Sequence, residues 1–143
     1  MPSPLIDQLI DQHHYSRLTA DNLDDFMDRD TTLALFLTED PKRYPESNDV
    51  AVILPELMSA FPERFEALVV DRSLESLFKE RYDVAVWPCL VFVRHGRYLG
   101  KINKVRDWSD YMALIPEILD RQPRHNPGVG IPLVNEPMER PNA

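Results

Sequence analysis

The segment from Thr31 to Thr38 constrains the fold of this chain more than any other. It reads TTLALFLT, so apolar side chains occupy both faces of an extended backbone. An uninterrupted apolar strand is typical of the centre of a sheet with helices on both sides. The chain has 143 residues, of which 43% are hydrophobic and 28% charged, which suits one domain with a substantial core. We therefore expect an α/β fold.

Hydrophobic periodicity places the other elements around this strand. The expected helices cover 4–11, 21–29, 50–61, 74–82 and the segment that starts near Asp107. The expected strands cover 31–38, 65–71, 90–93 and 98–102, and a tight turn at His95-Gly96 joins the last two. The final helix is expected to point Trp108, Tyr111 and Ile115 inward. The resulting order is β-α-β-α-β-β-α after an N-terminal helical stretch.

Composition excludes several classes of function and divides the chain in two. A net charge of −8 argues against a nucleic-acid partner, because no basic patch is evident. The chain shows neither a secretory signal nor an apolar run long enough to span a membrane. A single cysteine, Cys89, cannot form an internal disulfide, which favours the cytoplasm. Residues 1–121 form the expected domain, and 122–143 are expected to be a flexible, proline-rich C-terminal tail.

Two prolines indicate a more specific architecture. Val86-Trp87-Pro88 directly precedes a hydrophobic strand and hairpin, and Pro55 lies inside the helix that follows the first central strand. This arrangement resembles thioredoxin-like proteins, in which the proline before the hairpin is cis. The resemblance implies a three-layer α/β/α fold with a mixed central sheet of four or five strands.

The same resemblance locates the positions that carry redox chemistry in thioredoxins. Counted from Pro55, the two cysteines fall on Ser47 and Val50, and the buried acid falls on or near Leu35. Serine cannot replace a low-pKa thiolate, and valine cannot resolve a mixed disulfide. We therefore expect the scaffold without its chemistry and no catalytic residue. Cys89 is expected to be a small buried hydrophobe, although a single-cysteine thiol–disulfide oxidoreductase that uses it stays an alternative.

Several short stretches together resemble the hydrogenase-expression family HyaE/HupG/HoxO over roughly residues 20–120. They are Asp40-Pro41-Lys42-Arg43 followed by Pro45-Glu46, then VILPEL at 52–57 with Phe61-Pro62, and Arg81-Tyr82 ahead of Trp87-Pro88. The resemblance implies a cytoplasmic, non-redox accessory protein for the maturation of uptake nickel–iron hydrogenases. It also implies partners, namely the hydrogenase small-subunit precursor and its twin-arginine signal peptide.

Candidate partner-binding residues lie around the expected cis proline. The backbone at Trp87, next to Pro88, is a candidate edge for pairing with an extended peptide, and the Trp87 side chain either binds or packs. Glu39, Asp40 and Glu46 could meet arginines of a signal peptide, or the loop 39–47 is only a solvated connector. His13-His14 does not indicate a metal site, and no motif indicates a cofactor. A generic protein-interaction module is the remaining alternative.

Overall fold

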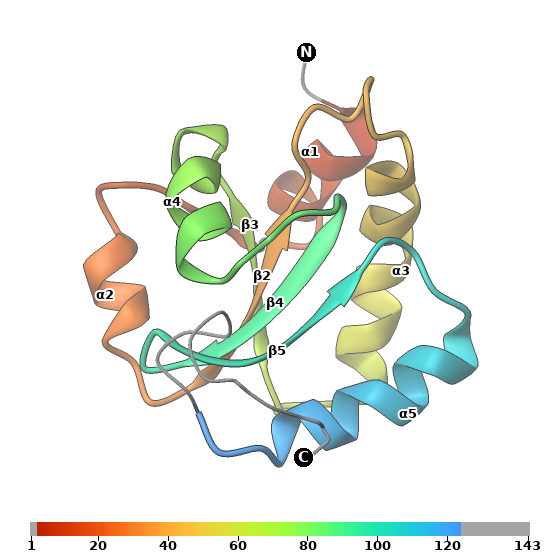
Figure 1. Ribbon diagram of the computed structural model, residues 1–143. Helices are drawn as coiled ribbons and strands as arrows, with labels where there is room; N and C mark the ends of the chain where they lie inside the picture. The colour runs from red at the N-terminus through yellow and green to blue at the C-terminus, as the bar shows by residue number, and fades with distance from the viewer. Residues whose placement is uncertain (1–2, 124–143) are drawn as a thin grey trace.

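The structure is a computed structural model, and it describes residues 3–123 (Figure 1). The helices are α1 Pro4–Asp11, α2 Leu23–Met27, α3 Glu46–Ala60, α4 Glu75–Arg81 and α5 Trp108–Leu119. A 3-10 turn, Arg72–Leu74, leads into α4. The strands are β1 Ser16–Leu18, β2 Thr32–Leu37, β3 Glu66–Val70, β4 Cys89–Arg94 and β5 Arg97–Asn103.

The five strands form one mixed sheet in the order β1-β3-β2-β4-β5. β1, β3 and β2 run parallel to one another, whereas β4 is antiparallel to both β2 and β5. All six residues of β2 are buried, as the apolar run predicts, because β2 has strands on both edges and helices on both faces. The register places Leu35 opposite Leu68 on one side and Val91 on the other. The expected central strand is therefore confirmed.

Two cores separate the three layers. Helices α1, α3 and α5 cover one face of the sheet, and α2 and α4 cover the other (Figure 1). The first core is built on Phe36, Leu54, Phe92 and Tyr111, and the second on Leu35, Phe78 and Tyr82. Alternate residues of β2 thus enter opposite cores, which is what the two-sided apolar pattern of a central strand requires. The expected three-layer α/β/α class is confirmed, with five strands.

Three details differ from the expectation. Helix α3 begins at Glu46, four residues before the expected start, so Glu46 and Ser47 belong to the helix and not to the loop 39–47. Strand β1 was not expected, because its three residues, SRL, are too few to show a period; it extends the sheet by pairing parallel to β3. Trp108 was expected to point inward, which is wrong, since its side chain is 45% exposed. Trp108 lies on the first turn of α5, and the buried positions of that helix begin at Tyr111.

The turn between β4 and β5 has the expected form. His95 and Gly96 both have positive φ angles, 54° and 70°, as a two-residue hairpin turn that follows the twist of its strands requires. The Tyr82 hydroxyl, from the end of α4, donates a hydrogen bond of 2.6 Å to the Gly96 carbonyl. This bond ties the hairpin tip to the second core. Of the predicted tail, residues 124–143 lie outside the described residues, and its flexibility stays a prediction.

Candidate functional site

The peptide bond between Trp87 and Pro88 is cis, as expected. It lies where the chain enters β4, at the end of the sheet that also carries the loop between β2 and α3 (Figure 1). The Pro88 carbonyl accepts a hydrogen bond of 2.7 Å from the backbone N–H of Lys104. Lys104 itself has a φ of 62°, a backbone conformation that residues other than glycine seldom adopt. The cis proline and the segment after β5 are therefore held together.

The backbone just before the cis proline is open to pairing. Within residues 3–123, no hydrogen bond joins a backbone group of Ala85, Val86 or Trp87 to another residue. Their neighbours differ, since Val84 donates its N–H to Lys79 and Pro88 accepts from Lys104. Such unpaired N–H and C=O groups are the groups that an added strand uses.

A groove of about 350 Å³ runs beside this backbone. We call it the cis-proline groove, and its lining residues are Arg43, Tyr44, Pro45, Glu46, Ala85, Val86, Trp87 and Lys104. The rings of Tyr44 and Trp87 lie 5.7 Å apart, centre to centre, and are tilted by 44°. The Lys79 ammonium lies 5.7 Å from the centre of the Trp87 ring. The groove therefore combines an aromatic wall with cationic groups.

Trp87 has one polar atom without a partner. Its indole Nε1 is shielded from solvent and has no hydrogen-bond acceptor among the described residues. Leaving a buried donor unpaired costs about 1–3 kcal/mol. The ring also packs against the second core, so the two interpretations of its side chain, binding and packing, are both compatible with its place at the groove wall.

The residues that the resemblance assigns to the thioredoxin redox positions, Ser47, Val50 and Leu35, are all buried. Ser47 is fully buried, and its hydroxyl donates to the Thr38 carbonyl at 2.7 Å. Val50 and Leu35 are 2% and 0% exposed. The Ser47 bond ties the first turn of α3 to the end of β2, so the serine holds the loop in place.

Cys89 is the one thiol of the chain, and it is 1% exposed. Burial raises its pKa to about 12, with a smaller opposing effect from Lys101. A reactive cysteine needs both access and a lowered pKa. Cys89 has neither, which matches the expectation of a small buried hydrophobe.

Glu75, at the start of α4, is a buried acid that the sequence analysis missed. It is 5% exposed, and its two carboxylate oxygens lie 3.1 and 3.0 Å from the backbone nitrogen of Glu39, which donates to them. Burial raises its pKa to about 7, although the Glu39 N–H favours the charged form. A signal was present, because Glu75 precedes Phe78 by three residues and Tyr82 by seven, which places it on the apolar face of the helix.

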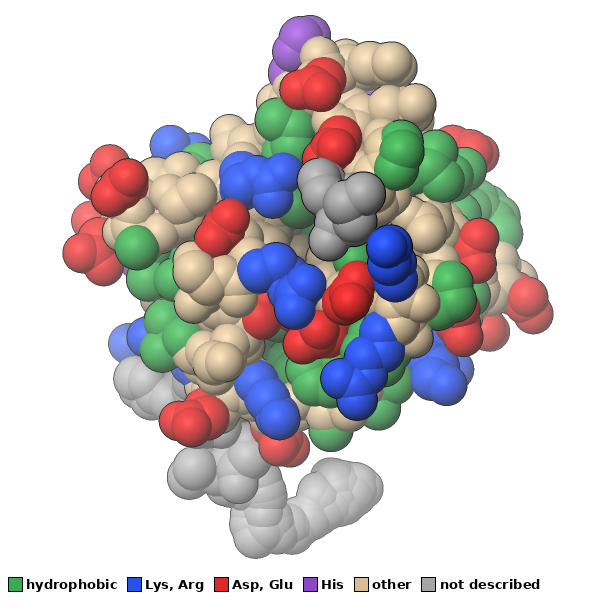
Figure 2. Space-filling view, turned by 90° about the horizontal axis from the view of Figure 1, so that it is seen from above, with side chains coloured by type: hydrophobic (Ala, Val, Ile, Leu, Met, Phe, Trp, Pro, Cys, Tyr) green, Lys and Arg blue, Asp and Glu red, His purple; other side chains and the backbone are tan. Residues whose placement is uncertain are grey.

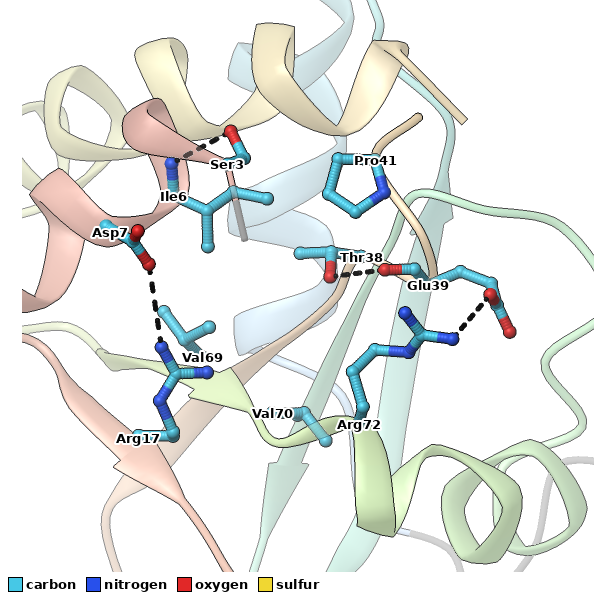
Figure 3. Close-up of a pocket in the computed structure, with 10 residues that line it drawn as sticks. All are labelled: Ser3, Ile6, Asp7, Arg17, Thr38, Glu39, Pro41, Val69, Val70 and Arg72. Carbon is cyan, nitrogen blue, oxygen red and sulfur yellow. Dashed lines mark hydrogen bonds and ion pairs between the residues drawn. The ribbon is translucent and has the colours of Figure 1, made fainter. Parts of the chain in front are cut away.

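The three candidate acids, Glu39, Asp40 and Glu46, do not share one site. The Glu39 carboxylate pairs with Arg72 at 3.0 Å and faces a separate cavity of about 210 Å³, which a second ion pair, Arg17 with Asp7 at 4.0 Å, also lines (Figure 3). Asp40 accepts from the backbone N–H of Lys42 at 3.1 Å.

Glu46 lies in the cis-proline groove, and its carboxylate accepts from the Val105 N–H at 3.4 Å. The structure thus brings Glu46, Trp87 and Pro88 together and places Glu39 on a neighbouring cavity. Seen from above, this end of the molecule carries Lys and Arg side chains interspersed with Asp and Glu (Figure 2).

Other chemistries find little support in the described part of the chain. Residues 3–123 contain no group of three His, Cys, Asp or Glu side chains that could hold a metal ion. None of the described helices has the length and apolar composition needed to cross a bilayer.

Comparison with known proteins gives a consistent family. A family model described as "Hydrogenase-1 expression protein HyaE" matches residues 5–111. The hydrogenase expression/formation protein HoxO of Azotobacter vinelandii is 42% identical over 119 residues, which cover 83% of this chain and 80% of that protein. A crystal structure of the putative hydrogenase expression/formation protein hupG from Rhodopseudomonas palustris is 40% identical and matches with a TM-score of 0.52, over 73% of this chain and 94% of that one.

The fold also matches a thioredoxin. Mitochondrial thioredoxin 3 from Saccharomyces cerevisiae, in its oxidized form, aligns with a TM-score of 0.58 over 76% of this chain and 97% of that one. Its sequence is 17% identical, so the match concerns the fold alone. The thioredoxin-like architecture expected from Pro55 and Pro88 is confirmed.

Proposed function

Because the chain belongs to the HyaE family of hydrogenase expression proteins, we propose that it is a non-catalytic chaperone or assembly factor for an uptake nickel–iron hydrogenase. It acts in the cytoplasm, where it binds the hydrogenase small-subunit precursor and its twin-arginine signal peptide before export. The fold supplies a rigid surface for this binding and contributes no covalent step.

The observation that carries this proposal is the unpaired backbone at 85–87 beside the cis proline. An extended peptide can pair with it as an added strand, because its N–H and C=O groups have no partner among the described residues. Main-chain pairing of this kind gives affinity, and neighbouring pockets give selectivity. The cis-proline groove is such a pocket, since Trp87 and Glu46 line it directly beside the edge.

A non-catalytic role is supported by the chemistry at the same end of the sheet. By the resemblance to thioredoxins, Ser47 and Val50 take the places of the two cysteines that a disulfide reductase needs, and both are buried. The thiol of Cys89 is also buried, and its pKa is raised to about 12, which disfavours the single-cysteine alternative. In the proposed complex, arginines of the signal peptide approach Glu39 and Asp40 at the beginning of the loop. The rest of the peptide crosses Trp87 and Pro88.

Calorimetric titration of the full chain with the small-subunit precursor tests the proposal. We expect binding with a Kd in the micromolar range or below, which is about −8 kcal/mol, and weaker binding when the signal peptide is removed. Absence of binding at roughly tens of micromolar would contradict the proposal.

Two variants at one position test the backbone edge. Val86→Pro removes the N–H that an added strand would use, whereas Val86→Ala keeps that N–H and trims only the side chain. We expect Val86→Pro to weaken precursor binding by about tenfold or more and Val86→Ala to have a smaller effect. Equal effects of the two variants would show that the main chain at this position is not the contact.

A further inference from the structure

The charge of the loop between β2 and α3 changes sign along its length. Glu39 and Asp40 are at its beginning, and Lys42 and Arg43 follow them. Glu39 faces the cavity that it shares with Arg72, on one side of the loop. Arg43 lines the cis-proline groove, on the other side. A segment that crosses the loop therefore meets an acidic end and then a basic one.

Cationic groups surround the cis-proline groove, although the chain as a whole carries a net charge of −8. Arg43 and Lys104 line it, and Lys79 lies over the Trp87 ring that forms its wall. The one acid in the lining, Glu46, already accepts the Val105 N–H. Two cations and one anion therefore line the groove, and Lys79 adds a third positive charge beside it, so the groove is net positive and attracts an anion.

Lys104 is positioned beside the cis proline by its own backbone. Its N–H donates to the Pro88 carbonyl at 2.7 Å, and its φ of 62° is one that a glycine would adopt more easily. The side chain is exposed and enters the groove lining. The Lys104 side chain therefore extends from a backbone position that is hydrogen-bonded to Pro88, the residue directly after the open edge at 85–87.

The remaining walls are apolar. Tyr44, Pro45, Val86 and Trp87 supply them, and the volume of about 350 Å³ is at the lower end for a ligand pocket. This volume suits one large apolar side chain with a carboxylate next to it. Trp87, whose indole N–H has no partner among the described residues, forms part of this wall.

We propose that the cis-proline groove takes an extended peptide segment in which an acidic residue lies two positions after a large apolar one, so that both side chains point to the same side of the strand. The segment pairs through its main chain with Val86, packs its apolar side chain on Trp87 and Tyr44, and directs its carboxylate to Arg43 and Lys104. This inference rests on the proposed function, because it specifies the chemistry of the segment that the partner presents at this site.

Three capped peptides that differ at one residue test the charge preference. Each contains Phe-Val-X-Val between Gly-Ser flanks, with X as Asp, Asn or Lys, so that Phe and X lie on the same side of the extended peptide. They are titrated into the full-length Trp108→Phe protein, in which Trp87 is the remaining tryptophan and its fluorescence reports on the groove. We expect the Asp peptide to bind about tenfold more tightly than the Asn peptide at low salt, and the Lys peptide to bind most weakly. The ratio should shrink in about 0.5 M salt, because exposed charges are screened.

A charge-reversed variant and a matched control locate the effect. Lys104→Glu should make the Lys peptide the tightest of the three. Lys42→Glu makes the same charge change on an exposed residue of the loop that does not line the groove, and it should leave the order of the peptides unchanged. Three results would each overturn the inference. They are equal affinities of the Asp and Asn peptides for the Trp108→Phe protein without a charge reversal, absence of binding by every peptide, and equal effects of the two charge reversals.

The same proteins separate this inference from the proposed function. If the protein binds the precursor but binds the three peptides with equal affinity, the proposed preference for an acidic segment is wrong and the proposed chaperone role stands. If the Asp peptide binds selectively while the precursor does not bind, the chemistry of the groove stands and the proposed partner is wrong.

Discussion

Replacement of Glu75 by glutamine tests the cost of holding a carboxyl group beneath the loop that begins at Glu39. The carboxylate is 5% exposed and accepts the Glu39 N–H. Glutamine has nearly the same shape, and its side-chain oxygen can still accept that bond. The variant therefore removes the ionisable carboxyl group and leaves the packing around it intact.

The expected effect depends on pH in a direction that the pKa fixes. Burial raises the pKa of Glu75 from 4.5 to about 7. Between these values the folded protein keeps a proton that the unfolded chain has lost, so each increase in pH favours unfolding. Below 4.5 the carboxyl is protonated in both states, and above 7 the full cost is present. A shift of this size corresponds to about 3 kcal/mol of stability lost as pH rises through that range.

Urea unfolding of the wild type and Glu75→Gln, followed by circular dichroism at several pH values, measures this cost. We expect nearly equal free energies of unfolding near pH 4 and a variant that is more stable by about 3 kcal/mol near pH 8. Other groups titrate alike in both proteins and cancel in the difference. Two parallel stability curves would refute the argument, because they would mean that Glu75 titrates as it does in the unfolded chain.

Three further predictions follow from buried contacts. Cys89 should not react with Ellman's reagent at neutral pH until urea unfolds the protein, because its thiol is buried and its pKa is raised to about 12; the protein should also fail to reduce insulin, and rapid labelling of the folded protein would contradict this. Gly100→Ala should lower the free energy of unfolding, measured with urea, by about 1–3 kcal/mol, since an added Cβ would lie 2.9 Å from Cγ1 of Ile118. An unchanged midpoint of the urea transition would show that α5 moves aside without cost. Tyr82→Phe should lose about 1–2 kcal/mol, because it removes the hydroxyl that donates to Gly96, and a melting temperature equal to that of the wild type would argue against a role for this bond.

Features that depend on local patterns were predictable from the sequence. The run 31–38 identified the central strand, because burial on both faces leaves no polar position. Pro88 and Pro55 predicted the thioredoxin-like architecture, because each proline restricts the backbone at a place where that fold uses the restriction. The assignment of the two thioredoxin cysteine positions to Ser47 and Val50 came from counting along one helix, and it stays a prediction.

Features that depend on distant residues were not predictable in this way. Arg43 and Lys104 line one groove although sixty-one positions separate them in the chain, so neither position alone indicates a shared cationic site. Ion pairing of Glu39 with Arg72 likewise joins two segments, and it gives this acid an internal partner that the loop sequence does not show. Strand β1 becomes a strand through its pairing with β3, which a three-residue sequence cannot indicate.

The two outer strands have a consequence for how molecules of this protein meet one another. β1 offers only three residues to an incoming strand, and on the other side Arg121 of the chain after α5 donates to the Leu99 carbonyl of β5 at 3.2 Å. Short or occupied outer strands are poor templates for adding another chain. Copies of the protein are thereby discouraged from joining sheet to sheet and aggregating at high concentration. If the open backbone at 85–87 binds the partner as we propose, the protein can expose that stretch without polymerising through the outer strands of its sheet.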